Sequence, residues 1–107
     1  MHKIVEKNST LPKDVIRDLQ KIKKILIRHG VRRIILFGSM ATGDYTDNSD
    51  IDICFEGIPA SKYFRVIAEC MIAVDRRISL LALEDLHGYL KEKALREGKI
   101  IYEKERA

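Results

Sequence analysis

One stretch of the chain, residues 31–56, restricts the possible folds more than any other. An apolar run over residues 31–37 ends at a Gly-Ser pair, and after an interval of ten residues a second apolar run opens with Asp-Ile-Asp. These runs predict two β-strands joined by a turn. Because side chains alternate between the faces of a strand, one face of the second strand would carry the acids and the other would belong to the core. The charged face would present Asp50, Asp52 and Cys54, and the core face Ile51, Ile53 and Phe55.

The two aspartates of the second strand need a positive partner. Aspartate is a poor strand former, and two carboxylates on one face repel each other unless a cation lies between them. Carboxylate oxygens suit Mg²⁺ or Mn²⁺, ions that retain several water molecules and accept phosphate oxygens in their open positions. The sequence therefore predicts a metal site at Asp50 and Asp52 that serves a phosphate-bearing ligand such as a nucleotide.

The Gly-Ser pair at the end of the first strand predicts a phosphate-binding turn. Gly38 would let backbone N–H groups approach a phosphate closely, and Ser39 would add a hydroxyl donor. Residues 39–43 are expected to form a helical turn whose N-terminus faces the same anion. The alternative is a surface turn before an Asp-rich strand that binds no ligand, but the apolar strands on both sides favour the nucleotide site.

The stretch GSMATGDYTDNSDID resembles the GS-x(10)-DxD signature of the nucleotidyltransferases of the DNA polymerase β superfamily. The chain is similar to the stand-alone members, the minimal nucleotidyltransferase (MNT) antitoxins, which are partners of HEPN-domain toxins encoded by an adjacent gene. The resemblance runs from the helix before the first strand to the tail at residues 83–103. It implies a polymerase-β-like fold and the transfer of AMP from ATP to a toxin tyrosine. By this resemblance Asp50 and Asp52 are the catalytic Mg²⁺ (or Mn²⁺) ligands, and Gly38 and Ser39 bind the nucleoside triphosphate.

Two positions depart from the family pattern. The family usually has a third carboxylate in the next strand, where this chain has Ser79, and a serine cannot act as a general base at neutral pH. The arginine that often follows the Gly-Ser-x-Ala segment is replaced by Thr42. Asp75 and Glu84 are the acids considered as substitutes, and the position of neither fits well. Two functions therefore stay open: an adenylyltransferase, and a catalytically weak or inactive module of the same fold that neutralises the toxin by forming a complex.

The rest of the chain predicts an α/β (α+β) domain in which a small mixed sheet packs against helices. The expected elements are a helix from Pro12 to Gly30, a helix capped by Ser61, a strand over residues 78–83, a helix that opens at Glu84 or Asp85 and stops at Gly98, and a short strand in the final KIIYE segment. Ile4 and Val5 are expected at most to pair briefly. The helix after Ser61 is expected to turn these residues toward the core: Phe64, Ile67, Ala68, Met71 and Ile72.

Composition limits the size and setting of the protein. A chain of 107 residues predicts one domain, residues 1–107, so a large acceptor would have to come with a partner. The net charge is +4 with scattered basic residues, so nucleic acid is an unlikely ligand, and Arg76 and Arg77 are interpreted as solvated element ends. Cys54 and Cys70 are expected to be buried, reduced thiols. With no signal peptide or membrane span, a cytoplasmic location is expected. The sequence leaves the oligomeric state open, a homo-oligomer included.

Overall fold

Helices and strands alternate along residues 11–105, the part of the chain that the computed structural model describes. The elements are α1 (Lys13–Arg28), β1 (Arg33–Phe37), α2 (Ser39–Thr42), β2 (Ile51–Glu56), the 3-10 turn η2 (Ala60–Lys62), α3 (Tyr63–Ala73), β3 (Ile78–Ala82), the 3-10 turn η3 (Leu83–Asp85), α4 (Gly88–Glu97) and β4 (Lys99–Glu103). The predicted order of elements is confirmed, and Ile4 and Val5 lie outside the described residues.

The four strands form one mixed sheet in the order β3-β2-β1-β4. β1 pairs antiparallel with both β2 and β4, whereas β2 and β3 run parallel. The antiparallel strands β1 and β2 are joined at one end of the sheet by residues 38–50, which include α2, whereas the parallel β2–β3 pair needs a crossover, which α3 supplies. This arrangement confirms the predicted α+β architecture with a small mixed sheet.

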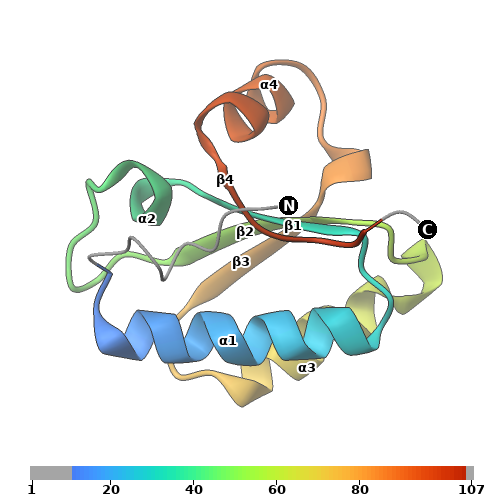
Figure 1. The fold of residues 1–107 in the computed structure, drawn as a ribbon, viewed down its shortest axis with the longest axis horizontal. Coiled ribbons are helices and arrows are strands. Elements are labelled where there is room, and N and C mark those ends of the chain that lie inside the picture. The colour runs from blue at the N-terminus through green and yellow to red at the C-terminus, as the bar shows by residue number, and fades with distance from the viewer. Residues whose placement is uncertain (1–10, 106–107) are drawn as a thin grey trace.

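The sheet lies between two layers of unequal size (Figure 1). α1 and α3 cover one face, and α4 with η3 lies on the other. Since β1 runs through the middle of the sheet, three successive residues are buried: Ile34, Ile35 and Leu36. A strand that is covered on both faces requires the continuous apolar run seen in the sequence. Among the described helices, none is long and apolar enough to span a bilayer.

β2 confirms the predicted alternation of side chains but not the character of its second face. Ile51, Ile53 and Phe55 belong to the larger core under α1 and α3. Cys54 faces the other way and is fully buried in a smaller cluster that includes Leu83. Cys54 is thus buried as predicted, but the face it shares with Asp52 is not only charged, because η3 and α4 cover the half that lies beyond Asp52.

The predicted core side of α3 is wrong for three of its five residues, while Ile67 does pack against the larger core. Phe64 and Ile72 are 87% and 85% exposed, and Met71 is 56% exposed, while Val66 and Cys70 are fully buried. The helix carries apolar residues around most of its circumference, so helical periodicity alone could not determine which side meets the sheet. Nor does Ser61 cap the helix: it lies within η2, and the residue before α3 is Lys62, with no side-chain capping bond.

The last helix begins later than its apolar pattern predicts. Leu86 is buried but extended, and α4 starts at Gly88, so the glycine opens the helix and does not interrupt it. Only Ala94 of α4 is buried, because the helix contacts the smaller cluster along one narrow face. Its predicted end at Gly98 is confirmed, as is the final strand.

Candidate functional site

Gly38 joins β1 to α2 and lies directly against Asp52. The last residue of β1, Phe37, pairs with Asp52 across the β1–β2 ladder. Gly38 has φ 71° and ψ −157°, a conformation that is essentially restricted to glycine. A Cβ at this position would overlap the Oδ2 atom of Asp52 and lie 3.2 Å from its Cγ. Glycine is thus required here both by the backbone conformation and by the carboxylate beside it.

α2 confirms the helical turn predicted for residues 39–43. The N–H groups of Ala41 and Thr42 donate to the carbonyl of Gly38 at 3.0 and 3.2 Å, and Gly43 N–H donates to Ser39 at 2.9 Å. Met40 and Ala41 are buried in the main core and anchor the turn. Ser39 and Met40 are the first two residues of α2, so no carbonyl within the helix can accept a hydrogen bond from their N–H groups.

The two aspartates of the motif interact with each other electrostatically. Asp52 is half-buried in β2, and its pKa is raised first by burial and then by the charge of Asp50. Asp50 lies just before β2, so the strand begins one residue later than predicted, and its carboxylate accepts a hydrogen bond from Arg77 Nε at 3.0 Å. The Arg77 side chain is 81% exposed, so solvent screens this ion pair strongly. The site therefore holds more negative charge than its protein partners neutralise.

Ser79 of β3 lies beside Asp52 of β2. In the parallel β2–β3 ladder Asp52 pairs with Ser79, so the structure places the serine where the next strand approaches the acid site. Within residues 11–105 no cluster of three or more His, Cys, Asp or Glu side chains is arranged to hold a metal ion. Glu84 is engaged elsewhere, since it accepts a hydrogen bond from Gly57 N–H at 2.9 Å. No described acid therefore joins Asp50 and Asp52 in such a cluster.

The residues that are present fit a hard divalent cation bound by few protein ligands. Asp50 and Asp52 offer carboxylate oxygens two residues apart, and a cation would offset the charge of Asp50 that, after burial, raises the pKa of Asp52. Mg²⁺ typically uses one or two carboxylates and fills its remaining positions with water or phosphate oxygens. Asp50 and Asp52 could thus hold such an ion, with Gly38 and Ser39 at the open side.

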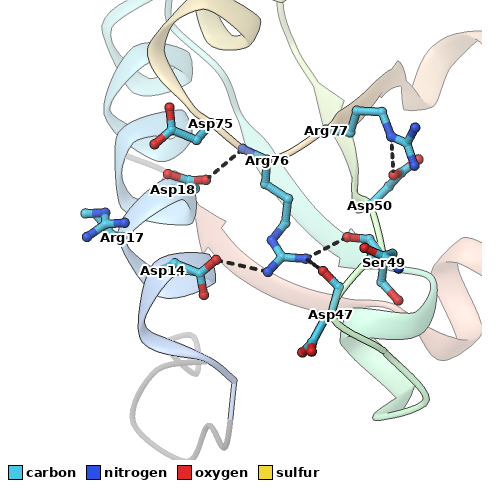
Figure 2. Close-up of a pocket in the computed structure, with 10 residues that line it drawn as sticks. Asp14, Arg17, Asp18, Asp47, Ser49, Asp50, Asp75, Arg76 and Arg77 are labelled. Carbon is cyan, nitrogen blue, oxygen red and sulfur yellow. Dashed lines mark hydrogen bonds and ion pairs between the residues drawn. The ribbon is translucent and has the colours of Figure 1, made fainter.

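A pocket of about 570 Å³ borders Asp50 on the side of α1. Figure 2 shows Arg76 at its centre, with Asp14 and Asp18 on one side and the loop before β2 on the other. The Arg76 side chain is only 16% exposed, which corrects the interpretation of this residue as a solvated helix end. Its partners are 27 and 62 positions away in sequence, so no local pattern could have revealed its role.

Comparison with known proteins assigns the family. The sequence profile described as "Polymerase beta, Nucleotidyltransferase" matches residues 20–107, which are most of the chain and include the glycine turn, both aspartates and Ser79. The fold and motif are those of a nucleotidyltransferase domain, and the chain belongs to the polymerase β nucleotidyltransferase family.

Two curated relatives come from Methanocaldococcus jannaschii. "Putative protein adenylyltransferase MJ0435" is 33% identical over 74% of this chain and 88% of its own length. "Putative protein adenylyltransferase MJ1379" is 34% identical over 77% of this chain and 88% of its own length. The match therefore spans most of both proteins.

Solved structures show the same fold. A crystal structure of a toxin–antitoxin with AMP-PNP superimposes with a TM-score of 0.68 at 26% identity, covering 79% of this chain and 73% of that one. The MNT antitoxin complex with the tri-AMPylated HEPN toxin of Shewanella oneidensis gives a TM-score of 0.64 at 21% identity, covering 85% and 73% of the two chains. The second likeness, at this low identity, shows the fold alone.

Proposed function

We propose that this protein is a nucleotidyltransferase-type antitoxin that transfers AMP from ATP to a tyrosine of a cognate HEPN toxin, with Mg²⁺ bound at Asp50 and Asp52. The observation that carries the proposal is the contact between Gly38 and Asp52, which brings the glycine turn and the coupled acids into one site. Relatives named as protein adenylyltransferases, and a toxin–antitoxin neighbour solved with AMP-PNP, support the nucleotide and the partner.

Each residue of the site has a defined task in this proposal. The N–H groups at the start of α2 and the Ser39 hydroxyl bind the triphosphate, and Gly38 lets the phosphates come close to Asp52. The metal, when bound by Asp50 and Asp52, neutralises charge on the phosphate oxygens. Transfer of AMP joins the tyrosine oxygen to the α-phosphorus and releases pyrophosphate, so the chain has mainly to align the two groups.

Deprotonation of the acceptor is the step that this chain supports least. Ser79, paired with Asp52, cannot take a proton at neutral pH, and general base catalysis typically contributes about 10²–10⁴-fold. The tyrosine proton would then pass to water or to a group of the partner. Transfer is therefore expected to be slow compared with an otherwise similar enzyme that has an acid at this position.

The two departures from the family pattern favour a second function. With Ser79 and Thr42 in place of the family's acid and arginine, the chain fits a binding module that neutralises the toxin by covering it. Such a module would retain the fold and the glycine turn but would transfer nothing. The two functions predict the same complex and differ only in whether the toxin is modified.

The test is a labelling reaction with the product of the adjacent reading frame, the proposed HEPN partner. Purified protein, partner, Mg²⁺ and α-labelled ATP are incubated, and the partner is analysed by mass spectrometry for an added AMP on tyrosine. The transferase proposal expects label that disappears in the Asp50→Ala and Asp52→Ala variants. Neutralisation of the toxin without any label would overturn it in favour of the binding module.

A further inference from the structure

We infer that Arg76 is a positioning residue for the proposed metal site: it holds the loop before β2 against α1 and so fixes the main chain that carries Asp50. This inference rests on the proposed function for its link to metal binding. Among the described residues, Arg76 forms no hydrogen bond or ion pair with Asp50 or Asp52, so its effect on these acids would be transmitted through the main chain of the loop.

The guanidinium of Arg76 connects two segments that are distant in sequence. One terminal nitrogen donates to the main-chain carbonyls of Asp47 and Ser49, at 3.1 and 2.9 Å. The other terminal nitrogen donates to the Asp14 carboxylate at 2.9 Å, in the first turn of α1. Figure 2 shows the side chain extended between the helix and the loop with both sets of bonds in place. A planar, forked cation is well suited to such divided bonding.

The backbone of Arg76 is held as well as its side chain. Its N–H donates to Asp18 Oδ2 at 3.4 Å, and Asp18 is 3% exposed on the buried side of α1. This bond attaches the main chain of Arg76 to α1, in addition to the bonds that its side chain forms. Its charge also lowers the pKa of Asp14, mainly through the hydrogen bond between the two side chains.

The geometry at the loop explains why Asp50 depends on this contact. Ser49, whose carbonyl accepts from Arg76, is the residue directly before Asp50, and Ile51 N–H, directly after it, donates to the carbonyl of Arg77 at 3.0 Å. Asp50 therefore lies between two main-chain contacts supplied by consecutive arginines. Within residues 11–105, the other hydrogen bonds of residues 46–49 are those of a local turn that joins Thr46, Asn48 and Ser49.

Burial distinguishes Arg76 from its neighbour. The Arg77 side chain, which contacts Asp50 directly, is 81% exposed, whereas that of Arg76 is 16% exposed. A buried, multiply bonded arginine holds its partners in one geometry, while an exposed ion pair opens and closes readily. Residues that orient metal ligands typically contribute about 10–100-fold to metal affinity.

The experiment compares the Arg76→Ala variant with an Arg17→Ala control. Arg17 lines the same pocket but is exposed, and its side chain forms no hydrogen bond or ion pair within residues 11–105. Two quantities are measured: Mn²⁺ affinity from the loss of free-ion EPR signal, and amide hydrogen exchange across residues 46–52 in the metal-free protein. Arg76→Ala should bind Mn²⁺ about 10-fold or more weakly and exchange faster in this loop, while Arg17→Ala should match the wild type in both.

The outcomes separate this inference from the proposed function. Wild-type Mn²⁺ affinity in a folded Arg76→Ala variant would overturn the inference, and so would unchanged exchange in the loop. If the alanine variant does not fold, Arg76→Lys, which keeps the charge but lacks the fork, is measured instead, and the same two losses are expected. If the wild type itself binds no Mn²⁺, the proposed function fails, and the exchange result still decides whether Arg76 holds the loop.

Discussion

The substitution Gly38→Ala tests the closest contact of the site. An alanine methyl group would overlap Oδ2 of Asp52 and lie 3.2 and 3.3 Å from its Cγ and Cβ atoms. Asp52 sits within a strand paired on both sides, so its backbone cannot retreat and its carboxylate must rotate away. The variant should therefore lose both stability and the geometry of the metal site.

The cost has two parts. A non-glycine residue at φ 71° and ψ −157° is strained by roughly 1–3 kcal/mol. Relief of the overlap adds roughly 1–3 kcal/mol, the usual range for an extra methyl group in a packed site. A combined loss of roughly 2–6 kcal/mol would lower the Tm by at least about 8 °C in a domain of this size. Displacement of the Asp52 carboxylate should also weaken Mn²⁺ binding by about tenfold or more, as loss of a well-oriented ligand does.

Gly43→Ala is the matched control for this substitution. Gly43 ends the same short helix with φ 93° and ψ 1°, but a Cβ there would meet nothing within 4 Å. It should cost only the left-handed backbone strain, about 1–2 kcal/mol, and leave Mn²⁺ affinity unchanged. Thermal unfolding and Mn²⁺ titration are measured for both variants. Equal losses of stability, together with wild-type Mn²⁺ affinity in Gly38→Ala, would refute the contact between Gly38 and Asp52.

Three further predictions concern charge and packing. The pKa of Asp52 is raised in the folded protein, so wild-type stability without metal should fall as pH rises from the ordinary aspartate value of 3.8 through the raised pKa. The Asp52→Asn variant should lack this fall and be at least as stable as the wild type at neutral pH. Urea unfolding across pH checks this, and a parallel pH dependence in both proteins would contradict it. The Ser79→Asp variant adds a carboxylate beside Asp52, so it should lower metal-free stability, tighten Mn²⁺ binding and speed AMP transfer by up to about 100-fold. The control variant Ser79→Asn should show none of these three effects. An unchanged transfer rate in Ser79→Asp would show that the residue is not at the family's third-carboxylate position. On α3, the exposed-site variant Ile72→Ser should change the free energy of unfolding by less than about 0.5 kcal/mol, and the buried-site variant Val66→Ala should lower it by about 1–3 kcal/mol. A larger loss in Ile72→Ser than in Val66→Ala would contradict the observed orientation of the helix.

The motif region could be predicted well because its signals are local. The apolar run before Gly38 and the alternation after Asp50 each depend on neighbours in sequence, and strand periodicity is a strong signal when one face is buried. The turn at residues 39–43 follows from the same local chemistry. These parts of the fold are confirmed by β1, α2 and β2.

The errors lie where tertiary packing decides between locally equivalent choices. α3 has an apolar surface on several sides, and only the sheet determines that Val66 and Cys70 face inward. Cys54 could not be recognised as part of a second core, because the cover over it comes from η3 and α4, about thirty residues or more further along the chain.

The role of Arg76 shows the limit of sequence patterns at the site. An adjacent pair of arginines after a helix is typical of a solvated end, and Arg77 does project into solvent. Arg76 instead turns inward because Asp14 and the carbonyls of the loop before β2 converge there. That convergence exists only after α1 and the β2–β3 pair have assembled.

Titration of Mn²⁺ in the presence of AMP-PNP tests the central claim most directly. The wild type should bind the ion more tightly with the nucleotide than without it, because triphosphate oxygens complete a coordination shell begun by Asp50 and Asp52. Asp50→Ala and Asp52→Ala should each lose this binding, while Arg17→Ala should retain it. Wild-type Mn²⁺ and nucleotide binding in Asp52→Ala would contradict the account, since the acids would then not form the site.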